Sequence, residues 1–282
     1  MKKLKRDFKN RIKLTFAIIS SFFKTANSQK TVVPILCYHS INNSNNYEAD
    51  SLPPSYFEQH LQYLNKNFTP ISLKKALDYI DGRCPEINDP VVVTFDDGYK
   101  DNYDIAFPLL KKYSIPATFF IVTGFINGNL KLINDINFNA MTWAQIKEMN
   151  DDGLFDFGAH TDSHPILSNI NSEDVVKELI SSKKIMEKEL DQAIDLFAYP
   201  NGQQEDVPDV ALKTVKNIFS CSCSTIWTTV HEPKDRFMLG RVMISGTDTL
   251  SYFKHKVLGN FDFIRYIQKT KFSNDNDISK YQ

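Results

Sequence analysis

The sequence has few cysteines, few glycines and no excess of charge of either sign, and each of these shortages excludes a class of protein. Its 282 residues include four cysteines and ten glycines. Four cysteines are too few for a disulfide-dense scaffold, and so little glycine excludes a collagen-like repeat. Lysine and arginine number 33 against 34 acidic residues, a net charge of −1. Because broad nucleic-acid binding usually requires a basic excess, we expect no nucleic acid among its partners.

Long hydrophobic runs are also missing, since no segment approaches the roughly 18 apolar residues of a membrane-spanning helix. A basic start leads into a ten-residue apolar run, Leu14–Phe23, followed by the small residues of Ala26-Asn27-Ser28. This order is typical of a secretory signal with a cleavage site. A basic amphipathic helix on an anionic membrane and an ordinary cytosolic helix are the alternatives. We interpret residues 1–30 as a signal or membrane-associated segment and expect an exported or cell-envelope protein.

The rest of the chain alternates short apolar runs with amphipathic ones, which indicates strands alternating with helices. Repeated β-then-α order predicts an α/β fold, a distorted (β/α) barrel with parallel strands and outer helices. We expect one domain over residues 31–270 and a polar tail over 271–282. The expected strands are Val32–Tyr38, Val91–Phe95, Ala117–Val122, Leu154–Gly158, Leu196–Tyr199 and Ile218–Ser224. The expected helices begin near Pro54, Ser72, Ile105, Thr142, Ser172 and residue 206.

Polar residues follow several of these strands, where a barrel of this kind places its reactive groups. Asp96 and Asp97 come directly after one strand, and His160 and His164 follow another. Two imidazoles and a carboxylate form a typical open zinc site, and either aspartate can supply the carboxylate. The other aspartate is then available as a general base, which indicates metal-assisted hydrolysis.

The remaining cysteines and histidines carry weaker signals. Cys221 and Cys223 lack the spacing of a zinc ribbon and have no matching second pair, so we interpret the cysteines as buried or half-buried thiols. We expect His60, His231 and His255 to face solvent or helix surfaces.

Several motifs together resemble one enzyme family. Val93–Gly98 (VTFDDG), Gly158–Pro165 (GAHTDSHP) and Phe197–Gly202 (FAYPNG) are similar to three signatures of the NodB-type polysaccharide deacetylases, carbohydrate esterase family 4. Val33–Ser40 (VPILCYHS) is similar to the opening strand of the branch that includes biofilm poly-N-acetylglucosamine deacetylases. The resemblance extends from about Val33 to Arg241.

The resemblance implies a role for each matching residue. Asp97, His160 and His164 would hold a divalent metal, with zinc expected first and cobalt, nickel or manganese as alternatives. Asp96 would take a proton from the attacking water. Asn201 would offer its backbone N–H to the oxyanion.

Two departures from the common family pattern reassign two further roles. Ala198 stands where most members have an arginine that orients the base, and Arg241 resembles the arginine used instead in the biofilm branch. The late histidine that serves as general acid is missing, and His39 resembles the early histidine that replaces it. Trp227, in a polar context, is our candidate for stacking on a sugar ring.

The expected function is therefore metal-dependent hydrolysis of N-acetyl groups on hexosamine residues of a cell-surface glycan, with release of acetate. An O-acetyl carbohydrate esterase and a catalytically silent glycan-binding module are the alternatives. The substrate would be the principal partner, and the N-terminal segment would provide any membrane association.

Overall fold

A computed structural model describes residues 31–44, 50–133 and 138–265. The expected N-terminal segment, the end of the expected domain after residue 265 and the polar tail lie outside these residues. No helix in the described ranges has the length and apolar character that crossing a membrane requires.

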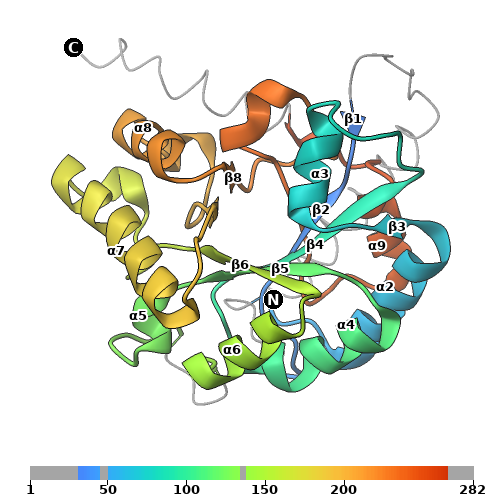
Figure 1. Cartoon of the computed structure of the whole chain (residues 1–282). Helices are drawn as coiled ribbons and strands as arrows, with labels where there is room; N and C mark the ends of the chain where they lie inside the picture. Colours follow the sequence, from blue (N-terminus) through green and yellow to red (C-terminus); the bar gives the residue numbers. More distant parts are fainter. Residues whose placement is uncertain (1–30, 45–49, 134–137, 266–282) are drawn as a thin grey trace, which may run out of the picture.

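A curved parallel sheet forms the centre of the molecule, with helices around its outside (Figure 1). Its strands follow the order β10-β2-β4-β5-β6-β7-β8, and β3 pairs separately with β4. The curled parallel sheet and its outer helices confirm the expected distorted (β/α) barrel. The strands of this sheet are β2 (Ile35–Tyr38), β3 (Thr69–Pro70), β4 (Pro90–Phe95), β5 (Ala117–Ile121), β6 (Phe155–Ala159), β7 (Leu196–Ala198), β8 (Cys221–Cys223) and β10 (Val242–Met243). A separate antiparallel pair joins β1 (Thr31–Val32) to β9 (Val230–His231).

Side-chain caps mark where several of the helices begin. Ser72, Asn171 and Thr249 each accept a hydrogen bond from a backbone N–H of the first turn, and Thr142 forms a capping box with Gln145. The α-helices are α2 (Pro54–Asn67), α3 (Leu73–Ile80), α4 (Phe107–Tyr113), α5 (Thr123–Ile126), α6 (Trp143–Asp151), α7 (Ser172–Leu190), α8 (Asp209–Ile218) and α9 (Leu250–Val257). A π-helix (η1, Asn102–Ala106) precedes α4, and the 3₁₀ turns are η2 (Leu167–Asn169), η3 (Gln204–Asp206) and η4 (Pro233–Phe237).

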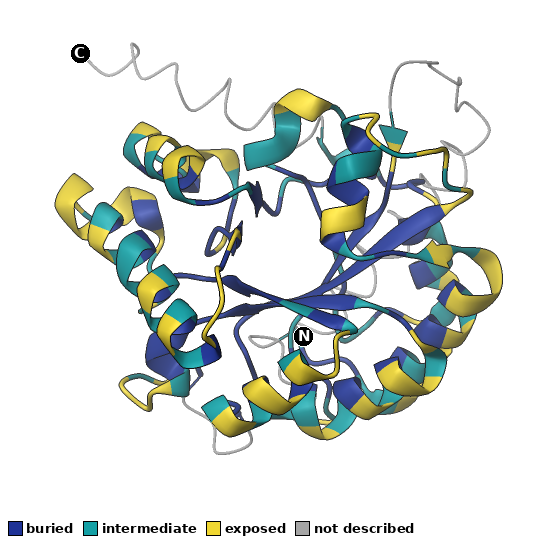
Figure 2. Cartoon of the chain, in the orientation of Figure 1, coloured by how far each residue is buried: buried dark blue, intermediate teal, exposed yellow. Residues whose placement is uncertain are grey.

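Alternation along the strands separates two sides of the sheet. Phe95 packs with Phe119 at 4.8 Å between ring centroids, within the cluster that includes the outer helices. Val92 belongs instead to a second cluster with residues of β2, β5, β7 and β8, on the interior side. Figure 2 shows this pattern as buried strands enclosed by helices whose outer faces are exposed. The residue after Phe95 therefore faces the interior, where the barrel opens.

The barrel closes irregularly between β8 and β10. Cys223 and Leu239 form an isolated parallel bridge, and the Leu239 N–H donates to Ser222 O at 3.0 Å. Two residues later, the Arg241 N–H donates to Ile226 O at 3.0 Å. This closure brings Arg241 to the barrel wall immediately before β10.

The cysteines are free thiols, as expected: Cys84 is partly exposed and the other three are buried. The expectation for two histidines is wrong. His60 stacks on Phe253 of α9 at 3.7 Å between ring centroids, and His231 has its Nε2 3.0 Å from Val33 O. Both are buried, whereas His255 is partly exposed. Packing partners far away in the sequence cover the two buried rings, and no local pattern indicates them.

Candidate active site

The three expected metal ligands converge at the carboxyl ends of β4 and β6. Asp97 Oδ1 lies 3.7 Å from His160 Nε2 and 3.5 Å from His164 Nε2. One ligand atom from each of the three residues lies within 4.8 Å of the others. Because Asp96 and Asp97 follow β4 directly and His160 follows β6, parallel pairing through β5 brings them to the same edge.

Two features suit this triad to a divalent cation. Asp97 Oδ1 is buried and has no hydrogen-bond partner in the described residues. A buried, unpaired carboxylate oxygen is unfavourable unless a cation or a donor compensates it. The two imidazole nitrogens beside it complete a donor set that suits zinc and related metals. The residues present therefore fit a metal ion.

The His160 ring is oriented by a hydrogen bond on its far side. Its Nδ1 lies 2.7 Å from Ala198 O at the end of β7. A carbonyl oxygen accepts only, so Nδ1 carries the proton and Nε2 keeps a free lone pair toward Asp97. Burial lowers the pKa of His160 to about 4, although the charge of Asp96 acts in the opposite direction. The ring is therefore neutral at neutral pH.

Asp96 is held by Arg241 in a buried, bidentate ion pair. Arg241 Nη1 and Nη2 each donate at 2.6 Å to a different oxygen of the carboxylate. The guanidinium is fully buried and also donates to Ser224 O and to Thr94 Oγ1, at 3.0 and 3.2 Å. Burial favours the neutral acid, but Arg241, followed by His160, outweighs it and lowers the pKa of Asp96 well below its ordinary value. Asp96 is therefore a carboxylate at neutral pH.

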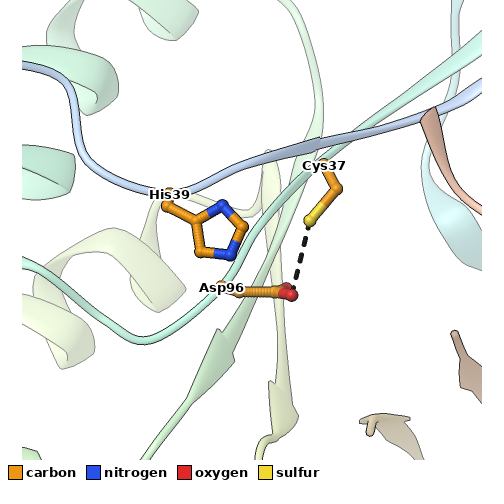
Figure 3. A group of neighbouring side chains, drawn as sticks. All are labelled: Cys37, His39 and Asp96. Carbon is orange, nitrogen blue, oxygen red and sulfur yellow. Dashed lines mark hydrogen bonds between the residues drawn. The ribbon is translucent and has the colours of Figure 1, made fainter. Parts of the chain in front are cut away.

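His39 lies beside Asp96 because β2 and β4 are parallel neighbours in register. Cys37 of β2 pairs with Thr94 of β4. His39 and Asp96 each come two residues later, so they lie on the same, interior side of the sheet. Figure 3 shows the three side chains of Cys37, His39 and Asp96 facing one another. His39 Nδ1 is buried and has no hydrogen-bond partner in the part of the chain that the structure describes.

The thiol of Cys37 lies beside the candidate base, a contact that the sequence does not indicate. It donates to Asp96 Oδ2 at 3.4 Å, and burial raises its pKa well above the ordinary value. Its sulfur lies within 4.8 Å of one ligand atom each of His39 and Asp96, so these three residues form a second group that could hold a metal ion. A cation there would lie beside the Arg241 guanidinium, which already binds both oxygens of Asp96, so this group is the poorer metal site.

Two expected substrate-binding residues have different surroundings. Asn201 follows β7 with a positive φ of 57°, and its side chain donates to Asp206 Oδ2 at 2.7 Å. Its backbone N–H makes no hydrogen bond within the described ranges.

Trp227 is only 8% exposed, and its ring lies 6.2 Å from that of Phe261. The exposed stacking face expected for Trp227 does not fit this placement, because the ring is part of the core.

Two further carboxylates hold the loops that carry the site. Asp101 accepts hydrogen bonds from Ser40 Oγ at 2.6 Å and from the Ile41 N–H at 3.0 Å, directly after His39. Glu178 of α7 accepts from the backbone of the segment between the two metal-site histidines. The sequence indicates neither role, because Asp101 acts on a loop distant in the chain and Glu178 lies within an ordinary helical pattern.

Comparison with known proteins identifies a family whose model covers the residues of the metal-site triad. The family model described as polysaccharide deacetylase matches residues 85–217, which include both aspartates and both histidines of the triad region. The chain belongs to the polysaccharide deacetylase family.

Individual relatives agree with this assignment. The chain is 32% identical to the Bacillus subtilis protein YxkH over 197 residues, 69% of this chain and 65% of that one. It is 32% identical to a Staphylococcus aureus poly-beta-1,6-N-acetyl-D-glucosamine N-deacetylase over 166 residues, 55% of each chain. The matches thus span between half and two thirds of these relatives.

Solved structures share the fold over most of the chain. The Streptococcus pyogenes deacetylase PplD in complex with acetate is 25% identical, with a TM-score of 0.69 over 81% of this chain and 99% of that one. IcaB from Ammonifex degensii is 26% identical, with a TM-score of 0.69 over 82% and 97% of the two chains.

Proposed function

We propose that this protein is a metal-dependent hydrolase that removes N-acetyl groups from hexosamine residues of a polysaccharide. The observation that carries the proposal is the adjacency of two units. A triad of Asp97, His160 and His164 suits a cation, and a separate carboxylate, Asp96, is fixed by Arg241 beside it. A cation site with a neighbouring ionised carboxylate is an arrangement that suits metal-assisted hydrolysis of an amide.

Asp97, His160 and His164 would hold the metal, and zinc suits two imidazoles and one carboxylate. Cobalt, nickel and manganese accept the same donors. When bound, the metal supplies Lewis acidity, which polarises the acetyl carbonyl and makes water easier to deprotonate. Family membership and the unpaired Asp97 Oδ1 support a metal there.

The chain's own residues account for the proton transfers. Asp96 accepts a proton from the attacking water as its oxygen bonds to the acetyl carbon. Each carboxylate oxygen has two lone pairs, so Asp96 can accept this proton while Arg241 holds it. His39, in its protonated form, then donates to the amide nitrogen as the carbon–nitrogen bond breaks. The products are acetate and a free amine, and the Asn201 backbone N–H would stabilise the oxyanion that forms between these steps.

The name of one relative supports the proposed substrate class. The Staphylococcus aureus relative is a poly-beta-1,6-N-acetyl-D-glucosamine N-deacetylase. We propose a polymer of N-acetylated hexosamine for this chain as well. Such a polymer lies outside the cytoplasmic membrane, so export through residues 1–30, or anchoring by them, is part of the same proposal.

Metal analysis coupled to acetate release tests this function. Purified protein would be analysed for bound metal and assayed on β-1,6-linked N-acetylglucosamine oligomers, chitooligosaccharides and acetylated xylan. We expect one equivalent of divalent metal and acetate release from at least one N-acetylated substrate, abolished by a chelator and restored by zinc. Release from xylan alone would identify an O-acetyl esterase, and glycan binding without any release would identify a silent binding module. Either result contradicts the proposal.

A further inference from the structure

The loop between the two metal-site histidines has an unfavourable backbone conformation. Thr161 and His164 have positive φ values of 65° and 57°, although neither is glycine. Such conformations cost free energy and persist only where the surroundings impose them. His164 is also the more exposed of the two imidazole ligands, with 31% of its side chain accessible against 2% for His160. Its position therefore depends on whatever holds this loop.

Glu178 of α7 supplies three of the hydrogen bonds that hold it. One carboxylate oxygen accepts from the Asp162 N–H at 2.8 Å and from the Ser163 N–H at 2.9 Å. The other accepts from Ser163 Oγ at 2.5 Å. Hydrogen bonds from backbone N–H groups to a carboxylate are charge-assisted and roughly twice as strong as neutral ones. One half-buried side chain thus fixes two consecutive peptide groups immediately before His164.

The opposite side of the loop is fixed by α5. The Gly124 N–H donates to Asp162 O at 2.8 Å, and Thr123 Oγ1 donates to Asp162 Oδ1 at 2.5 Å. A Cβ at position 124 would lie 2.5 Å from Asp162 O, so this close approach requires glycine. The loop is held between α5 and α7, and Glu178 is its connection to the longer helix.

We propose that Glu178 is a positioning residue for the metal site, one that holds the loop so that His164 Nε2 faces Asp97 before metal binds. The inference rests on the proposed function, because it assigns Glu178 a role toward the same cation. Without the carboxylate, the loop would leave its strained conformation for part of the time. The apparent metal affinity then falls in proportion to the fraction of molecules whose ligands remain in place.

Zinc affinity, measured by competition with a chromophoric chelator, tests this role independently of turnover. In Glu178→Ala we expect affinity to fall by about 10- to 100-fold, the usual effect of removing a group that orients metal ligands. Glu178→Gln keeps an oxygen for the two backbone N–H groups and an amide that can donate to Ser163 Oγ. Its affinity should remain within about threefold of the wild type. Glu173→Gln, an exposed position on the same helix, is the matched control and should leave zinc affinity unchanged.

Amide hydrogen exchange in the zinc-free protein provides the second measurement. We expect faster exchange at Asp162 and Ser163 in Glu178→Ala, since their N–H groups lose their acceptor. Wild-type zinc affinity in Glu178→Ala would overturn the inference, and so would a lowered melting temperature without a change in affinity. An equal loss in Glu178→Gln and Glu178→Ala would exclude a geometric origin.

The same experiment separates failure of this inference from failure of the proposed function. If wild-type protein binds no zinc and releases no acetate, the metal centre itself is wrong and both proposals fall. If wild-type protein binds zinc and releases acetate but Glu178→Ala binds zinc equally well, only the role of Glu178 is rejected.

Discussion

At the scale of single residues, the site depends on keeping two adjacent aspartates in different states. Asp97 presents an unpaired oxygen to two imidazoles, whereas both oxygens of Asp96 receive hydrogen bonds from Arg241. Consecutive residues point in different directions, so one aspartate can bind a cation while its neighbour remains free of it. The positive φ of Asp97, 78°, marks the point where the chain turns away from β4 to achieve this.

Replacing the candidate base should separate proton transfer from metal binding. In Asp96→Asn, the three metal-site residues are unchanged, so we expect metal content to stay at the wild-type level. An amide cannot take a proton from water, and turnover should fall by about 10²- to 10⁴-fold. Acetate release and metal analysis on the same preparation check both expectations. Turnover near the wild-type rate would remove Asp96 from the mechanism.

Replacing the candidate acid, His39, should likewise reduce turnover without affecting metal binding. His39→Gln should bind metal normally and lose about 10²-fold or more in turnover, because no proton donor then faces the leaving nitrogen. His255→Gln is the matched control, since His255 is partly exposed and hydrogen-bonds to Asn260 instead. Equal turnover in the two variants would exclude His39 as the acid.

At the scale of elements, the candidate site residues follow the ends of strands, and neighbouring helices hold the loops that carry them. Asn102, the first residue of η1, donates to His39 O at 2.7 Å. Asp101, immediately before η1, accepts hydrogen bonds from Ser40 and Ile41, the two residues that follow His39. A π-helix is rare and is frequently found at functional sites. Here its first turn is tied to the loop that carries the candidate acid.

Asp101→Ala should therefore affect turnover more than metal binding. Its carboxylate accepts four hydrogen bonds from the 40–42 loop and Asn102, and burial raises its pKa above the ordinary value. Losing them should displace His39 and reduce turnover by about 10- to 100-fold with zinc affinity unchanged. Asp104→Ala, which removes only an exposed ion pair with Lys100, is the control. A matching loss of zinc affinity in Asp101→Ala would contradict this division of roles.

The order of these elements was largely predictable from the sequence, and their tertiary partners were not. Six expected strands correspond to β2 and β4 through β8, because buried parallel strands are short apolar runs ended by polar turns. β10 and α9 were not expected. β10 is two residues long, and α9 has a weak apolar pattern because its buried face includes Lys256, paired with Asp248 at 2.5 Å.

Side-chain roles show the same limit. Motifs indicated Asp96, Asp97, His160 and His164 because chemistry is confined to strand ends in this fold. Glu178 lies within an ordinary amphipathic helix, and nothing in its local sequence separates it from neighbouring glutamates. Trp227 was misjudged for the opposite reason, since its polar neighbours suggested exposure while a distant aromatic residue, Phe261, covers it.

At the scale of the whole molecule, closure of the barrel joins the two ends of the domain at the site. β10 pairs with β2, so the segment that contains Arg241 lies beside the strand that leads to His39. The candidate acid, His39, and the arginine that holds the candidate base lie about 200 residues apart in the sequence, and closure of the barrel brings them together. Pairing of β10 with β2 is therefore part of what brings Arg241 to Asp96.

The two buried histidines outside the site should make the stability of this closed barrel depend on pH. Burial lowers the pKa of His60 to about 3 and that of His231 to about 4. The unfolded value is about 6.5, so below that pH the unfolded chain binds more protons than the folded one. Stability is therefore full above pH 6.5 and decreases as the pH falls toward 4.

Urea unfolding at pH 7.5 and pH 5.5, in the presence of a chelator, measures this effect. A histidine that stays neutral when folded should cost about 1.4 kcal/mol over that interval. In His60→Gln, the loss between the two pH values should be smaller than in the wild type by about that amount, because glutamine does not titrate. The Gln side chain can still donate to Asp248 O, the present neighbour of His60 Nε2 at 3.0 Å. An identical pH dependence in the two proteins would mean that the pKa of His60 is the same in the folded and unfolded states, and would contradict this prediction.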